Sequence, residues 1–164
     1  MQKVQDKVLS SGSNVSNAHP FESPDLHPWD VGIAVAEMQE LLRTQGFEIR
    51  VDGDFGWRTE VAVKRFQRQQ GLRVDGIVGR ETWVALRSAV KAGTRLLRQG
   101  RSGSDVAELQ GLLQVHGYPV QRDGIFGTET RQAVVAFQQA HHLSGNGVVG
   151  ATTWFLLRGR SLNK

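Results

Sequence analysis

Residues 35–67 read VAEMQELLRTQGFEIRVDGDFGWRTEVAVKRFQ, and residues 106–138 read VAELQGLLQVHGYPVQRDGIFGTETRQAVVAFQ. The two segments lie 71 residues apart and stay aligned without a gap as far as Leu86 and Leu157. Most of the identical positions are apolar residues or glycines, the types that build a core and its turns. A repeat of this length and quality indicates that the chain contains one small fold twice.

A shorter pattern, [DN]-G-x-[FV]-G-x-x-T, occurs twice within each copy. It begins at Asp52, Asp75, Asp123 and Asn146. An Asx-Gly pair favours a tight turn, because glycine accepts a positive φ and the Asx side chain bonds nearby amides. The second glycine of the pattern, or the threonine after it, is placed to start a helix, and the pattern leaves open which of the two caps it.

The spacing of apolar residues predicts three helices in each copy. Val35, Met38 and Leu41 recur at intervals of three and four residues, which is typical of an amphipathic helix. A second helix is expected across residues 62–66 and a short third one across 83–86. The second copy repeats these spacings. The predicted fold class is therefore all-α, with two tandem three-helix modules joined internally by DG-x-[FV]-G turn loops.

Four further residues are expected to serve this fold. Gly46 and Gly117 lie just past the first helix of each copy, where a left-handed C-cap is expected. Trp83 and Trp154 are expected to fill the two small cores. A module of about 50 residues lies near the lower size limit for folding without disulfides or metal.

The repeat also divides the chain. With 164 residues, 39% of them hydrophobic, the protein is long enough for two very small domains. A flexible N-terminal lead is expected over residues 1–34, tethered to the first copy by Trp29. The predicted division is completed by a module over 35–86, a basic linker over 87–105, a second module over 106–157 and a basic tail over 158–164.

The net charge of +4 lies outside the repeated modules. Each module is close to neutral, whereas residues 87–105 and 158–164 carry an excess of lysine and arginine. We expect this excess to form solvated charge runs. A nucleic-acid groove would place the charge on the folded face itself, so a nucleic-acid partner is not favoured.

Several classes of protein and site are excluded or disfavoured by the residues present. No apolar run approaches the roughly 20 residues of a membrane-spanning helix. The absence of cysteine excludes disulfides and thiol nucleophiles. His141 and His142 are adjacent, and neighbouring helical residues point about 100° apart, which makes a poor metal site. Asp52-Gly53-Asp54 resembles a calcium loop, but Val63 stands where the twelfth-position glutamate belongs.

No catalytic residues and no cofactor are expected. Paired carboxylates for glycoside cleavage need a separation of about 5–10 Å within a cleft. Glu37 and Glu108 are the only glutamates that recur at the same position in both copies, and a solvated helix face accounts for them. No Ser-His-Asp order stands out. The chain is therefore predicted to be a binding protein and not an enzyme.

The two copies resemble the three-helix peptidoglycan-binding domain that is attached to many bacterial cell-wall hydrolases. The motifs of that family are an L-Q on the first helix, DGxFG and DGxVG loops, A-V-x-x-F-Q on the second helix, and a final T-W-x-x-L. In the first copy they stand at Met38-Gln39, Asp52 to Gly56, Asp75 to Gly79, Ala62 to Gln67, and Thr82 to Leu86.

The second copy carries the same motifs and, in addition, the upstream L-x-x-G-x-x-G-x-x-V form that begins at Leu97. The first copy departs from this form at residues 27–30, so its first helix is expected to begin differently. The resemblance covers about two-thirds of the chain.

This resemblance implies non-covalent binding to murein, through its peptide stems, as a targeting or accessory module for wall remodelling or lysis. It implies peptidoglycan as the partner and a cell-wall hydrolase as a second one. Location in the cell wall or periplasm is expected from the family. Residues 1–16 show no secretory signal, which keeps a cytoplasmic location open.

Candidate ligand-binding residues are those near the first turn that a core does not explain. Trp57 stands where the second copy has Thr128, so packing does not require it. Arginine can bond the carboxylates of a peptide stem, and aromatic side chains suit a sugar backbone better. The predicted set comprises Phe47, Arg50, Trp57, Arg58, Tyr118 and Arg122.

Two other functions remain as alternatives. A cytoplasmic protein-interaction scaffold could use the same fold, and the missing signal peptide favours it. A nucleic-acid binder acting through the basic linker is the weaker alternative, and its binding would collapse as the salt concentration rises.

Overall fold

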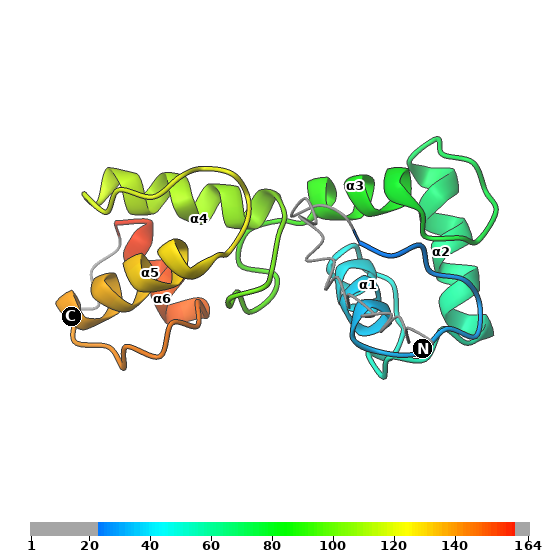
Figure 1. Ribbon diagram of the computed structural model, residues 1–164, viewed down its shortest axis with the longest axis horizontal. Coiled ribbons are helices and arrows are strands. Elements are labelled where there is room, and N and C mark those ends of the chain that lie inside the picture. Colours follow the sequence, from blue (N-terminus) through cyan, green and yellow to red (C-terminus); the bar gives the residue numbers. More distant parts are fainter. Residues whose placement is uncertain (1–22, 160–164) are drawn as a thin grey trace, which may run out of the picture.

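The computed structural model describes residues 23–159, which form an all-α chain with six helices, consistent with two three-helix modules (Figure 1). Module 1 denotes the first three helices with the residues that precede them, and module 2 the last three with the connection that leads to them. The helices are α1 (Ile33–Thr44), α2 (Trp57–Gln69), α3 (Arg80–Ala89), α4 (Ser104–Val115), α5 (Thr128–Ala140) and α6 (Ala151–Leu157). The chain passes from one module to the other between the end of α3 and the start of α4 (Figure 1).

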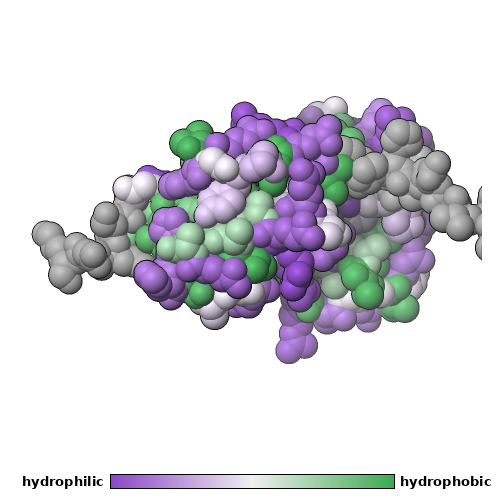
Figure 2. Space-filling view, turned by 60° about the vertical axis from the view of Figure 1, so that its left-hand side comes forward, coloured by the Kyte–Doolittle hydropathy of each residue, from purple (hydrophilic) through white to green (hydrophobic). Residues whose placement is uncertain are grey.

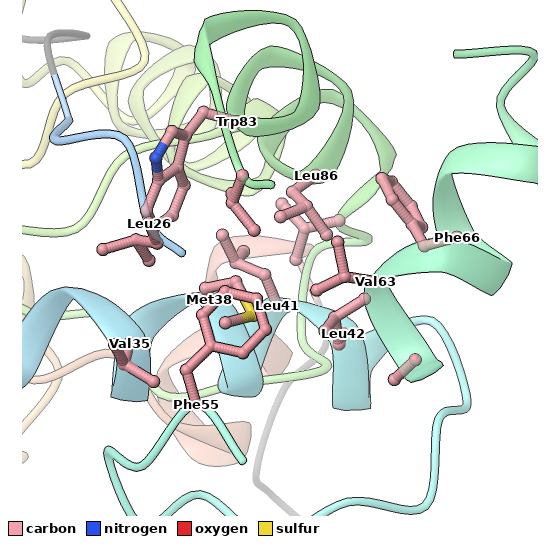
Figure 3. Packing of buried hydrophobic residues seen from close by; sticks show 13 residues of the cluster. Leu26, Val35, Met38, Leu41, Leu42, Phe55, Val63, Phe66, Trp83 and Leu86 are labelled. Atoms are coloured by element: carbon pink, nitrogen blue, oxygen red, sulfur yellow. The ribbon is translucent and has the colours of Figure 1, made fainter. Parts of the chain in front are cut away.

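Each module has its own core, in which its three helices meet. Figure 3 shows the core of module 1. In module 1 the buried side chains of α1, α2 and α3 form one cluster, which also includes Phe55 from the first turn and Leu26 from the segment before α1. Trp83 and Trp154 are both buried, as predicted. Removal of this apolar surface from water is the main force that holds such small modules together.

Four buried glutamines hold the four turns. The side-chain amide of Gln39 on α1 donates hydrogen bonds to Asp52 Oδ1 and to the carbonyl of Asp54, both at 2.9 Å. The Gln39 Oε1 atom accepts the backbone N–H of Gly53 at 2.9 Å. Equivalent bonds are made by Gln67, Gln110 and Gln138. The glutamine that ends each helical motif is therefore a clamp on the turn that follows it.

The second glycine of each turn, and not the threonine, is the N-cap of the following helix. These N-caps are Gly56, Gly79, Gly127 and Gly150, and none has a side-chain capping bond. The Thr59 hydroxyl instead accepts a hydrogen bond from Gln39 Nε2 at 3.2 Å. The threonine thus belongs to the clamp, which settles the choice that the sequence left open.

The segment before α1 packs onto module 1. Leu26 is buried and exchanges two backbone hydrogen bonds with Val78, at 3.2 and 2.9 Å. Leu97 and Val149 form the same bridge in module 2. The side chain that anchors this segment is Leu26; Trp29 is 76% exposed, so the expected tether through Trp29 is wrong.

The first helices of the two modules begin at equivalent positions, Ile33 and Ser104. The expectation of a different start in the first copy is therefore wrong. The backbone explains why: Trp29 adopts a φ of 79°, close to the 92° of its counterpart Gly100, so the two lead-in segments follow similar paths despite their different residues. Residues 1–22 and 160–164, and with them the question of a signal segment, lie outside the described residues.

Arginines of the basic linker are engaged in ion pairs. Arg95 and Asp105 form a pair whose side chains are 2% and 1% exposed, with Nε–Oδ2 at 2.8 Å. Arg101 pairs with Glu40 of α1 and so connects the two modules. The expected solvated charge run is therefore wrong at these positions.

The repeated glutamate has a structural role as well. Glu37 pairs with the buried Arg87 at 3.2 Å, and the Arg87 guanidinium lies 4.7 Å from the centroid of the Trp83 ring. Glu108 and Arg158 form the same pair in module 2. The pair in module 1 ties α1 to α3, which the predicted solvated face did not anticipate. In module 2 the two partners are 44% and 49% exposed, in keeping with that prediction.

The ionised carboxyl of Asp75 is expected to stabilise module 1, and this contribution should be lost in acid. The N–H of Ile77, followed by the amide of Gln67, holds the pKa of the Asp75 carboxyl below its ordinary value. A lowered pKa in the folded state stabilises the fold above the unfolded pKa of about 4, and this contribution is lost as the pH falls through the folded pKa. Asn146 occupies the same place in module 2 and makes the same bond to the turn at 2.9 Å.

Urea unfolding of the wild type and of the Asp75→Asn variant between pH 7 and pH 3 measures this contribution. The stability advantage of the aspartate should be constant above pH 5 and should shrink as the pH falls below about 4. Parallel pH profiles for the two proteins would contradict the assignment.

Candidate functional site

A groove crosses module 1 between residues 46–50 and the start of α2. It consists of two adjoining hollows of about 820 and 520 Å³. Phe47, Trp57 and Arg58 are among the residues that line both hollows, so the hollows adjoin there. We call these two hollows together the module 1 groove.

Aromatic rings and guanidinium groups alternate along this groove. Trp57 is the first residue of α2 and is 63% exposed. The Arg58 guanidinium lies 5.3 Å from the centroid of its ring, and Arg65 lies 5.9 Å from the centroid of Phe47. Phe47 itself is half-buried and packs edge-on against Phe66 of the core, with the ring centroids 6.4 Å apart. The groove therefore has one rigid aromatic residue and one open one.

The charged residues of the groove are of both signs. Four arginines line it, at positions 43, 50, 58 and 65. Among residues 23–159, none of these four forms an ion pair. Three carboxylates line it too, those of Glu48, Asp52 and Asp54.

Asp52 belongs to the turn more than to the groove. The backbone N–H of Asp54 and then the side-chain amide of Gln39 hold the pKa of the Asp52 carboxyl below its usual value. Its Oδ1 atom accepts both of these hydrogen bonds. This carboxylate therefore stays ionised and serves the turn, which leaves Glu48 and Asp54 as the acidic side chains of the groove.

The structure brings four of the six predicted ligand-binding residues together in this groove: Phe47, Arg50, Trp57 and Arg58. The other two lie in module 2. Tyr118 packs edge-on against Phe137, with the centroids 6.0 Å apart. Arg122 donates Nε–H to the carbonyl of Ala107 at 3.0 Å and so lies along α4.

Sequence reasoning missed Arg43, Glu48, Asp54 and Arg65. A usable signal existed for the two arginines, because module 2 has Gln114 and Ala136 in their places. The same comparison of the two copies that singled out Trp57 would have found them. Their placement in one groove, however, depends on how α1 and α2 pack together.

Within residues 23–159, no group of three histidine or acidic side chains is arranged to hold a metal ion. No helix in this same range has the length and apolar character needed to cross a membrane. One face of the molecule is mostly hydrophilic, with smaller hydrophobic areas between the polar ones (Figure 2).

Comparison with protein families gives a match over most of the chain. The family described as "Putative peptidoglycan binding domain" matches residues 32–86 and again residues 102–157. The two matches coincide with the two modules and include their turns and clamps.

Two curated relatives are longer proteins, and this chain matches only a part of each of them. The chain is 39% identical over 105 residues to the N-acetylmuramoyl-L-alanine amidase CwlM of Mycobacterium tuberculosis, covering 60% of this chain and 26% of the amidase. It is 29% identical over 174 residues to the amidase CwlL of Bacillus licheniformis, covering 89% of this chain and 48% of that enzyme. The chain thus spans between a quarter and a half of these curated relatives.

A solved structure of a peptidoglycan-binding protein from Clostridioides difficile, in complex with glutamine hydroxamate, is 37% identical. The similarity covers 43% of this chain and 48% of that one, with a TM-score of 0.41.

Proposed function

The chain belongs to the family of peptidoglycan-binding domains, and from this membership we propose that it binds cell-wall peptidoglycan through the peptide stems, without catalysing a reaction. Its role is to target or assist an enzyme of wall remodelling or lysis, so a cell-wall hydrolase is the proposed partner. The proposed location follows from the ligand and is the cell wall. The observation that supports this function best is the module 1 groove.

The chemistry of the groove suits the peptide part of the ligand. A guanidinium group can donate two parallel hydrogen bonds to one carboxylate, and it stays charged at every physiological pH. Arg50 and Arg58 are exposed, and both line the same hollow as Trp57. A free carboxylate of a stem would bond an arginine, while the apolar part of the stem would lie against the Trp57 ring.

Co-sedimentation with purified sacculi tests this proposal. Wild-type protein should pellet with the sacculi. The Arg58→Ala variant should bind about ten- to 100-fold more weakly, since one charge-assisted contact contributes about 1.5–3 kcal/mol. The Trp57→Ala variant should weaken binding by a similar factor, since burial of a large apolar side chain contributes about 1.5–3 kcal/mol. Trp29→Gly is the matched control: Trp29 is also exposed, it does not line the groove, and module 2 has Gly100 at this position.

The outcomes separate the function from its site. Unchanged pelleting of both groove variants would keep peptidoglycan as the ligand and refute the groove. Wild-type protein that stays in the supernatant would refute the proposed function and favour the alternative of a protein-interaction scaffold.

A further inference from the structure

We propose that the two modules are functionally unequal: module 1 alone recognises the ligand, and its groove selects a peptide that carries free carboxylates together with a free ammonium group. This inference rests on the proposed function and deepens it. It is carried by a comparison of two copies of one fold within a single chain.

Five groove residues of module 1, its four arginines and Trp57, have no like residue in module 2. The counterparts of its four arginines and its exposed tryptophan are uncharged or acidic. In order along the chain, the pairs are Arg43 and Gln114, Arg50 and Gln121, Trp57 and Thr128, Arg58 and Glu129, and Arg65 and Ala136.

The fold itself does not require these residues. Both modules have the same helices, the same two glutamine clamps, a tryptophan in the core and the same Leu–Val bridge. Module 2 builds all of this without a single one of the groove arginines. Stability therefore does not account for the five residues, and recognition of a ligand does.

The residues that replace Trp57 and Arg58 in module 2 also disfavour the binding of an acidic ligand. Thr128 accepts an exposed hydrogen bond from the side-chain amide of Gln99 at 3.1 Å, so the residue at the position of Trp57 already has a partner within the chain. Glu129 follows it at the start of α5 and is exposed. A carboxylate that Arg58 would attract in module 1 would be repelled by Glu129 in module 2.

The balance of charge in the module 1 groove points to a ligand of mixed charge. Four arginines face three carboxylates, and the carboxylate of Asp52 is committed to the turn. A polyanion such as a nucleic acid would meet Glu48 and Asp54 as repulsive groups. A short peptide with carboxylates and an ammonium group can satisfy both signs, because the arginines bind the carboxylates and the acidic side chains accept from the ammonium.

Replacement of the groove residues of module 1 by their counterparts from module 2 tests this inference. The first variant gives module 1 the residues of module 2, through Arg43→Gln, Arg50→Gln, Trp57→Thr, Arg58→Glu and Arg65→Ala. The matched control replaces the module 2 residues Gln114, Gln121, Thr128 and Glu129 by Ala. Circular dichroism and thermal unfolding check that both variants fold, which is expected because the first one carries residues that the same fold already accepts.

The exchange variant should bind sacculi about 100-fold more weakly than the wild type, and the control should bind equally well. Wild-type binding together with unchanged binding of the exchange variant, or an equal loss in the control, would overturn the inequality of the modules and leave the proposed function intact. Failure of the wild type to pellet would overturn both.

Competition identifies the class of ligand. Stem peptides released from sacculi by an amidase should displace the wild-type protein at lower concentration than purified glycan strands or heparin do. Displacement by glycan strands or by heparin at lower concentration than by the stem peptides would overturn the mixed-charge peptide as the ligand.

Discussion

Replacing Asp105 by Ala is expected to lower the free energy of unfolding of module 2 by about 3–5 kcal/mol, because it leaves the Arg95 guanidinium buried without its counter-charge. The two side chains are almost completely buried and meet through two bonds, Nε–Oδ2 at 2.8 Å and Nη2–Oδ1 at 3.1 Å. Arg95 also donates to the carbonyl of Ser102 at 2.8 Å. A module of this size has a total stability of only a few kcal/mol, so most of module 2 should unfold.

The indole NMR signal of Trp154, the one tryptophan of module 2, reports this unfolding during a urea titration. The double variant Arg95→Met, Asp105→Ala is the control, and it should recover most of the lost stability. Module 1 has Pro24 and Ala34 at these positions, so the fold does not depend on the pair. Equal destabilisation of the single and double variants would show that lost contacts, and not an uncompensated charge, cause the effect.

Replacing Gln39 by Leu is expected to destabilise module 1 by about 3 kcal/mol and to weaken binding of sacculi. Leucine is apolar and cannot accept the backbone N–H groups of Asp52 and Gly53, which lie 3.0 and 2.9 Å from Oε1. It also leaves the Asp54 carbonyl without its donor. Each partly buried polar group that loses its partner costs about 1–3 kcal/mol, less where water can replace the partner.

The turn that Gln39 holds is also a wall of the groove, since both Asp52 and Asp54 line it. The matched variant is Gln110→Leu, which removes the same clamp from module 2. Urea unfolding should show a similar loss of stability for both variants. Co-sedimentation at a temperature where both remain folded should show weaker binding only for Gln39→Leu. Equal weakening by both would contradict a groove confined to module 1.

The helices and most of the core of each module could be predicted from the sequence, because they depend on the local spacing of apolar residues, which occurs in both copies. Val35, Met38 and Leu41 lie three and four residues apart, and the structure buries all three on α1. Trp83 and Trp154 were expected in the cores and lie there. The exposure of Trp57 followed from its replacement by Thr128 in the second copy, which needs no knowledge of the tertiary structure.

The glutamine clamps could be predicted from the sequence only in part. Gln39 and Gln67 stood out as motif residues, but a glutamine on a helix is ordinarily an exposed residue. Its burial becomes understandable only when the turn it serves is seen, because the turn supplies partners for every polar atom of the amide. Whether the threonine of the motif caps the helix could not be decided from the sequence for the same reason.

The repeat, the helices and the core residues that the helices contribute follow from the order of amino acids alone, since periodicity and turn chemistry act between close neighbours. The ion-pair partners of the arginines and the set of residues in the groove do not follow from the order of amino acids alone. Arg87 meets Glu37 across fifty positions of sequence, and Arg43 joins Arg65 along one groove only because α1 and α2 pack together. Charged side chains are long and carry no periodic signal, so the packing of the helices selects which of them meet, which become buried and which remain open for a ligand.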